Sequence, residues 1–125
     1  MGYYHQWEDF PERDVYYLPG MEIKVRIMSS ERIMLTNIKA KKGVSIRMHH
    51  HEPEQILLVY KGKIRARTAK EEPKIIGPGD IWIVPSNCPH AAEYVEETEA
   101  LEIVSPLRLD NFVGYTVSHT FFDKD

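Results

Sequence analysis

The chain has 125 residues, a formal net charge of −3 and a single cysteine. This length favours one domain with a real hydrophobic core, and the mixed charges give no reason to expect binding to nucleic acid or to an anionic membrane surface. One cysteine excludes an internal disulfide framework. No apolar run is long enough to span a membrane or to form a signal core, so we expect a cytoplasmic protein.

Short alternating segments follow one another along the chain, and helical periodicity is almost absent. Gly62 predicts a tight hairpin, and the run from Gly77 to Asp80 predicts a firm turn. Short strands separated by such turn signals are typical of an all-β sandwich or barrel. The expected strands cover residues 15–18, 22–28, 31–40, 44–51, 55–61, 63–69, 73–76, 80–84, 89–95, 99–105 and 112–118.

No internal repeat, low-complexity tract or linker divides the chain. Residues 1–14 are irregular and rich in charged and aromatic side chains. We expect an N-terminal arm over residues 1–20, a single domain over residues 21–118 and a C-terminal tail over residues 119–125. Arms of this kind often pair with the sheet edge of a second subunit. The sequence therefore predicts a homodimer.

The stretch over residues 43–62, GVSIRMHHHEPEQILLVYKG, contains three consecutive histidines. With the period of two of a strand, His49 and His51 share a face and His50 points the other way. Two imidazoles on one face of a strand are close enough to bind one metal ion. A further ligand would come from a neighbouring strand, and Gln55 begins the next apolar run.

A second stretch, residues 79–94, reads GDIWIVPSNCPHAAEY. It places a glycine, five residues, a proline and then His90 at the expected start of a strand. Cys88 occupies an apolar position before Pro89, which favours a small buried side chain over a thiolate ligand. Taken alone, His90 fits a ligand and a satisfied core histidine equally well.

Together these two stretches resemble the two motifs of the cupin superfamily. The first motif is a glycine, five residues, His-x-His, three or four residues, a glutamate, six residues and a glycine, and its positions here are Gly43, His49, His51, Gln55 and Gly62. In the second motif Gly79, Pro85 and His90 match, whereas Asn87 stands for a second glycine and Tyr94 for an asparagine. The resemblance covers residues 20–110. It implies a single-domain jelly-roll β-barrel with one divalent metal ion held by His49, His51, Gln55 and His90.

Gln55 stands where most members of this superfamily carry a glutamate. A neutral amide oxygen leaves the full charge of the ion in place, which strengthens it as a Lewis acid and lowers the pKa of a bound water. Three imidazoles and an amide oxygen suit Ni, Zn, Fe, Mn or Co without choosing among them. The departure favours Lewis-acid chemistry on a carbonyl or enol over oxygen activation.

The chain is also similar to the small pectin-degradation cupins that linearise unsaturated uronate sugars. Their Asp-x-Phe-Ser-Pro-Pro-Arg segment corresponds here to residues 102–108, EIVSPLR, in which Val104 replaces an aromatic residue that could stack on a sugar. The resemblance implies that Glu102 moves a proton as general acid or base and that Arg108 holds a substrate carboxylate. A surface arginine paired with Asp110 is the alternative for Arg108.

Two further residues are candidates for substrate binding. Arg47 shares the face of His49 by alternation, so it either reaches the pocket as a second anion holder or lies at the rim. Tyr94 occupies a position of the second motif.

The function expected is that of a metal-dependent enzyme of isomerase or lyase type. Its substrate would be a small carboxylate or sugar acid, and its reaction a ring opening, tautomerisation or isomerisation. A non-haem metal dioxygenase or oxidase and a non-catalytic protein that binds a metal and a small ligand remain open. The fold alone does not decide among them, because one scaffold hosts many chemistries.

Overall fold

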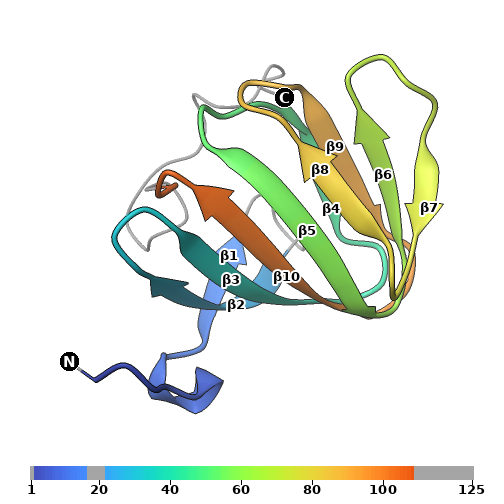
Figure 1. Ribbon diagram of the computed structural model, residues 1–125. Helices are drawn as coiled ribbons and strands as arrows, with labels where there is room; N and C mark the ends of the chain where they lie inside the picture. Colours follow the sequence, from blue (N-terminus) through green and yellow to red (C-terminus); the bar gives the residue numbers. More distant parts are fainter. Residues whose placement is uncertain (1, 17–21, 109–125) are drawn as a thin grey trace.

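A computed structural model describes residues 2–16 and 22–108 of the chain (Figure 1). The predicted strand over residues 112–118 and the predicted tail lie outside these residues. No helix within them has the length and apolar character needed to cross a bilayer. The elements are η1 (Trp7–Asp9), β1 (Arg13–Tyr16), β2 (Glu22–Ser29), β3 (Met34–Ala40), β4 (Ser45–His49), β5 (Glu54–Lys61), β6 (Ile64–Thr68), β7 (Lys74–Ile76), β8 (Ile81–Val84), β9 (His90–Tyr94) and β10 (Thr98–Ser105).

The strands form two antiparallel sheets. The larger sheet has the order β1-β2-β3-β10-β5-β8 and the smaller has the order β4-β9-β6-β7. Figure 1 shows them as two layers of one sandwich. The sheets are not hydrogen-bonded into a closed barrel, but the all-β class predicted from the sequence is confirmed, and two facing antiparallel sheets fit the expected jelly roll.

The alternating pattern of the strands produces the core between the layers. Along β10 every second residue, beginning with Thr98, is buried, and β5 and β3 alternate in the same way. Side chains of a strand point to opposite faces in turn, so each of these strands gives one face to the interior. The interior is closed by large apolar side chains such as Leu57, Ile64 and Trp82.

Gly62 does not close the predicted hairpin. It follows β5 in the larger sheet and precedes β6 in the smaller one, so the chain crosses there from one layer to the other. Its φ is +90°, and a Cβ atom there would overlap the carbonyl oxygen of Glu97 and lie 2.8 Å from the Cα of Thr98. Glycine is required at this position both for the backbone conformation and for space.

The predicted turn from Gly77 to Asp80 is confirmed. The amide of Asp80 donates to the carbonyl of Gly77 at 3.0 Å, and the carboxylate of Asp80 accepts from the amide of Gly77 at 2.8 Å. Gly79 has a φ of +93°, which only glycine adopts without cost. This turn also carries the chain between the two sheets, from β7 to β8.

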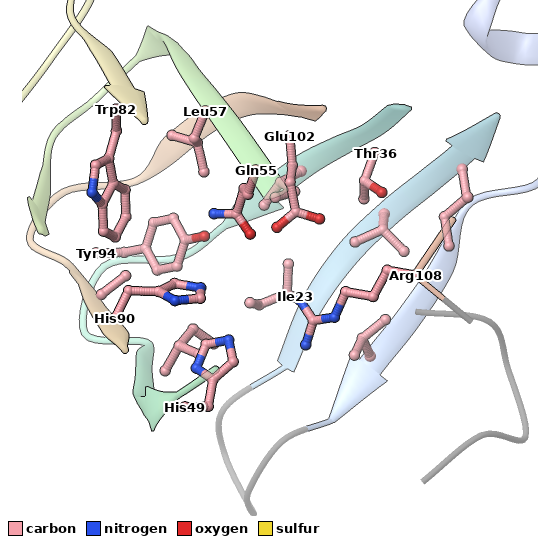
Figure 2. A pocket seen from close by; sticks show the side chains of 16 residues that line it. Ile23, Thr36, His49, Gln55, Leu57, Trp82, His90, Tyr94, Glu102 and Arg108 are labelled. Carbon is pink, nitrogen blue, oxygen red and sulfur yellow. The ribbon is translucent and has the colours of Figure 1, made fainter. Parts of the chain in front are cut away.

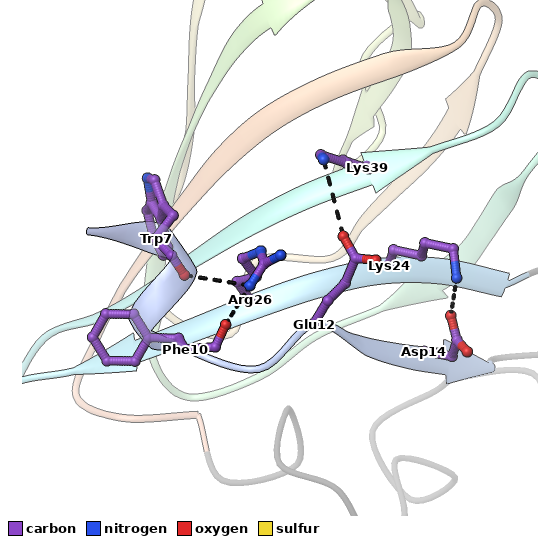
Figure 3. Close-up of polar contacts among 7 residues, drawn as sticks. All are labelled: Trp7, Phe10, Glu12, Asp14, Lys24, Arg26 and Lys39. Carbon is purple, nitrogen blue, oxygen red and sulfur yellow. Dashed lines mark hydrogen bonds and ion pairs between the residues drawn. The ribbon is translucent and has the colours of Figure 1, made fainter. Parts of the chain in front are cut away.

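Part of the predicted N-terminal arm belongs to the larger sheet. β1 pairs with β2 of its own chain, and η1 lies against the outer side of β2 (Figure 3). There the guanidinium of Arg26 donates to the carbonyls of Trp7, at 3.4 Å, and Phe10, at 2.5 Å. Two ion pairs hold the arm further: Lys24 with Asp14 at 2.8 Å and Lys39 with Glu12 at 3.9 Å. Pairing of the arm with a second subunit stays a prediction.

Candidate metal centre and the adjoining cavity

Three buried histidines converge at one end of the sandwich. His49 ends β4, His51 follows it in the loop and His90 begins β9, where it lies directly opposite His49 in the strand pairing. Their ring centroids are 4.2 Å apart for His49 and His90, 4.8 Å for His51 and His90, and 5.6 Å for His49 and His51. One ring nitrogen of each lies within 4.8 Å of the others, so the three are placed to bind one metal ion.

The main chain orients all three rings in the same way. Each Nδ1 lies at hydrogen-bonding distance from a carbonyl oxygen two residues away in the sequence. A carbonyl oxygen can only accept, so Nδ1 carries the proton and the neutral ring presents its acceptor nitrogen at Nε2. The partners are Arg47 for His49 at 2.8 Å, Pro53 for His51 at 2.8 Å and Cys88 for His90 at 2.9 Å.

Burial keeps two of these rings neutral. Loss of solvent lowers the pKa of His49 from 6.5 to about 3, and the neighbouring His90 and Arg108 add to the effect. Loss of solvent also lowers the pKa of His90 to about 4. A metal ion binds the neutral imidazole, so near neutral pH no proton has to leave these two rings first.

The Oε1 atom of Gln55, which begins the inner face of β5, and the Nε2 atom of His90 are buried at this end without a hydrogen-bond partner in residues 2–16 and 22–108. Leaving such atoms buried and unsatisfied is costly unless a ligand binds them. Each of these atoms has a lone pair that can coordinate a first-row divalent metal. The residues present therefore fit a divalent ion but do not select one metal.

A cavity of about 50 Å³ continues from the histidines between the sheets (Figure 2). Its wall is mostly aliphatic, with polar groups at the two ends. The lining residues are Val15, Ile23, Val25, Ile27, Thr36, Ile38, Ile46, His49, Gln55, Leu57, Trp82, His90, Ala92, Tyr94, Glu102 and Arg108.

Three candidate residues from the sequence lie in this cavity. Glu102 is buried on β10, and Arg108, which follows β10, is buried with its guanidinium directed inward (Figure 2). Arg108 lowers the pKa of His90, whereas Glu102 raises it, so both charges act on the histidine end. Tyr94 is buried on β9 with its hydroxyl toward the cavity. The alternative of a surface position for Arg108 is wrong, and Asp110 lies outside the described residues.

Arg47 is not among the described residues that line the cavity. The pairing of β4 with β9 shifts register between Ile46 and His49. Both residues therefore line the cavity, although residues three positions apart on a regular strand face opposite sides. An irregularity of this kind reverses the alternation beyond it. Arg47 instead lines a groove on the other side of the smaller sheet with Arg65 and Arg67.

Two nearby residues stay apart from the three histidines. His50 is half-buried, and its Nδ1 lies 3.4 Å from Oδ1 of Asn87. Cys88 is also half-buried, and its carbonyl rather than its thiol serves the site by orienting His90.

Thr36 is a cavity residue that the sequence reasoning missed. It is buried on β3, and in the strand pairing it lies opposite Glu102. No motif contains it. Only the alternation of β3, combined with its register against β10, could have found it.

Comparisons with known proteins agree with this geometry. The profile of a family described as cupin domain matches residues 37–105. Oxalate decarboxylase OxdC from Bacillus subtilis strain 168 is 32% identical over an 82-residue match, and the match covers 61% of this chain and 21% of that protein. The chain thus spans about a fifth of this curated relative.

Two solved structures match this chain over nearly their whole length. An RmlC-like cupin from Shewanella frigidimarina NCIMB 400 is 21% identical with a TM-score of 0.78, over 90% of this chain and 97% of its own. KdgF from Halomonas sp. is 26% identical with a TM-score of 0.73, over 84% of this chain and 95% of its own. The first of these likenesses concerns the fold alone.

Proposed function

The chain belongs to the cupin family, and on that basis we propose that it is a metal-dependent enzyme acting on a small carboxylate substrate. One observation carries the proposal. Three histidines and Gln55 meet at one end of a cavity that also contains a buried carboxylic acid and a buried arginine. A metal ligand set, a proton carrier and an anion holder in one cavity are the parts that such catalysis needs.

The chemistry of the similar proteins supports an acidic substrate. Oxalate decarboxylase, which is similar to part of this chain, is named for an organic acid. In this chain a divalent ion on His49, His51, Gln55 and His90 would supply a Lewis acid that polarises a carbonyl or hydroxyl of the substrate.

The chain's own residues would do the rest. Arg108 would hold the substrate carboxylate with two parallel hydrogen bonds and so fix the orientation of the molecule. Glu102 would take a proton from the carbon next to the carbonyl and return it at another position, which amounts to a tautomerisation or isomerisation. For a cyclic hemiacetal, Glu102 would take the proton of the anomeric hydroxyl; a carbonyl forms at that carbon as its bond to the ring oxygen breaks, and the ring oxygen takes up a proton. The aliphatic wall would exclude water from these steps.

Proton exchange tests this reaction class directly. Metal-loaded protein is incubated in deuterated buffer with a 2-oxo acid and, separately, with an unsaturated uronate. NMR follows loss of the proton next to the carbonyl of the oxo acid and appearance of the open-chain product of the uronate. We expect enzyme-dependent exchange or product formation, and a loss of about 100-fold or more in Glu102→Gln with the metal content unchanged.

Other results would identify the other functions. Oxygen uptake that depends on added iron would replace the proposal with a dioxygenase or oxidase. Binding of the acid without exchange, product or oxygen uptake would make the chain a non-catalytic binding protein. Unchanged exchange in Glu102→Gln would remove Glu102 from the mechanism.

We further propose that the chain forms a homodimer through the outer face of the larger sheet. Ile81, Ile83 and Tyr60 are 64%, 62% and 56% exposed on that face. They continue into half-buried apolar neighbours, because Ile56 lies opposite both Ile83 and Ile103 in the strand pairing. The outer side of β2 is contacted by η1 of the same chain, whereas β5 and β8 present this apolar area at the surface.

The charges at the margin of this face favour a second copy as the occupant. Glu99 lies between Lys39 and Lys61 on neighbouring strands. A two-fold interface brings the same surface together twice, so a margin with both signs can pair with itself. A flat apolar sheet face also packs well against another sheet.

A further inference from the structure

The cavity wall contributed by β1, β2 and β3 is aliphatic at every lining position except one. Thr36 is the exception. The other lining residues from these strands are Val15, Ile23, Val25, Ile27 and Ile38. A ligand that reaches this side of the cavity therefore meets one hydroxyl and otherwise only hydrocarbon.

That hydroxyl is placed for a ligand. Thr36 is 3% exposed, and its Oγ1 is buried with no hydrogen-bond partner in the described part of the chain. Valine has nearly the same shape and would fill the position without a polar atom to satisfy. Figure 2 shows Thr36 beside Glu102 and away from His49 and His90, with the guanidinium of Arg108 extending into the cavity between them. A ligand that lies between Thr36 and Arg108 therefore meets a hydroxyl and a guanidinium.

The charges of the cavity favour an anion there. Among the described lining residues the charged side chains are Glu102 and Arg108, which are opposite in sign. Amide and neutral imidazole ligands do not reduce the charge of a bound divalent ion. With an ion at the histidine end the cavity would carry a net positive charge, which an anionic ligand balances.

We infer that the cavity selects a small carboxylic acid with a short aliphatic body. The carboxylate binds Arg108 and the Thr36 hydroxyl, and the body packs against the aliphatic residues of β2 and β3. A sugar acid fits poorly, because its ring hydroxyls would face hydrocarbon and lose their hydrogen bonds to water. This substrate class refines the proposed function and rests on it, because both place the substrate in this cavity.

The indole nitrogen of Trp82 donates to the hydroxyl of Thr68 at 2.8 Å, so this lining donor already has a partner.

A titration with matched acids tests the selectivity. NMR and calorimetry measure the binding of 3-methylbutanoate, glycerate and galacturonate to the chelator-treated protein and to the protein loaded with Zn²⁺. We expect 3-methylbutanoate to bind at least about tenfold more tightly than either hydroxylated acid, the size of effect that unpaired polar groups cause in an apolar site. Tighter binding of galacturonate or glycerate would overturn the inference.

A matched pair of variants tests the role of Thr36. In Thr36→Val we expect the affinity for 3-methylbutanoate to fall about five- to tenfold, as expected for the loss of one hydrogen bond to a charged group. The control is Thr98→Val on β10, whose hydroxyl bonds the carbonyls of Glu96 at 2.9 Å and Lys63 at 3.3 Å outside the cavity. It should leave the affinity unchanged. Equal affinities in Thr36→Val and the unaltered chain would remove Thr36 from the binding site.

The same titrations separate this inference from the proposed function. If Zn²⁺ does not bind but the preference for the aliphatic acid persists in the metal-free protein, the metalloenzyme proposal fails and the ligand class stands. If Zn²⁺ binds and the hydroxylated acids bind more tightly, the ligand class fails and the metalloenzyme proposal stands.

Discussion

The two faces of the larger sheet use neighbouring residues of the same strands in different ways. On β5, Gln55 and Leu57 face the cavity, whereas Ile56 between them faces outward. On β10, Glu102 faces inward and Ile103 outward. The inner face alternates polar and apolar groups around the cavity, while the outer face of β5 and β8 is largely apolar. One period-two pattern thus serves both the proposed chemistry and the proposed assembly, and substitutions on one face should leave the other property intact.

The largest effect is expected on the outer face. Replacing Ile81 and Ile83 together by lysine puts like charges at the centre of a two-fold interface, so the dissociation constant of the dimer should rise by about a thousandfold or more. Analytical ultracentrifugation over a concentration series measures it. Metal content should not change, because both residues are exposed on the side of β8 opposite the cavity.

Glu71→Lys is the control for charge in that experiment. It changes the net charge by the same amount at an exposed residue between β6 and β7. It should leave the dimer intact. A monomeric unaltered chain, or a double lysine variant that still forms dimers, would contradict an interface on this face.

A smaller effect is expected on the inner face of β5. Gln55→Leu replaces the amide by a shorter, branched hydrocarbon and so removes its oxygen, and the affinity for a divalent ion should fall at least about tenfold. Competition with a coloured chelator measures this affinity. The neighbouring outward variant Ile56→Thr should bind the ion as tightly as the unaltered chain, and an unchanged affinity in Gln55→Leu would exclude the amide as a ligand.

The smallest effect concerns stability. Because the Thr36 hydroxyl is buried without a partner within the described residues, Thr36→Val should stabilise the ligand-free fold by about 1 kcal/mol. The melting temperature should rise by about 4 °C. Thr98→Val should lower it, since that hydroxyl is bonded. Differential scanning calorimetry distinguishes the two, and a loss of stability in Thr36→Val would mean that the hydroxyl already has a partner.

The sequence was most informative where a short spacing determines the geometry. Most predicted strands lie within three residues of the observed bounds, because alternation and turn residues are local properties. The histidine cluster was also predictable. His49 and His51 are two residues apart, and the second motif brought in His90.

Features that depend on pairing between distant strands could not be predicted. The shift between β4 and β9 moves Arg47 away from the cavity, and nothing near Arg47 in the sequence signals it. Gly62 was predicted to close a hairpin because the sequence does not reveal that its flanking strands belong to different sheets. Thr36 becomes notable only when β3 is aligned with β10.

The position of β10 has a consequence for synthesis of the chain. It is the last strand in the described sequence, and it lies between β3 and β5, pairing with both. Until residue 105 has left the ribosome, the strands on either side have open edges and no common partner. The two parts of the sheet therefore cannot pair through β10 before then, and Glu102 reaches the cavity with the strand that joins them.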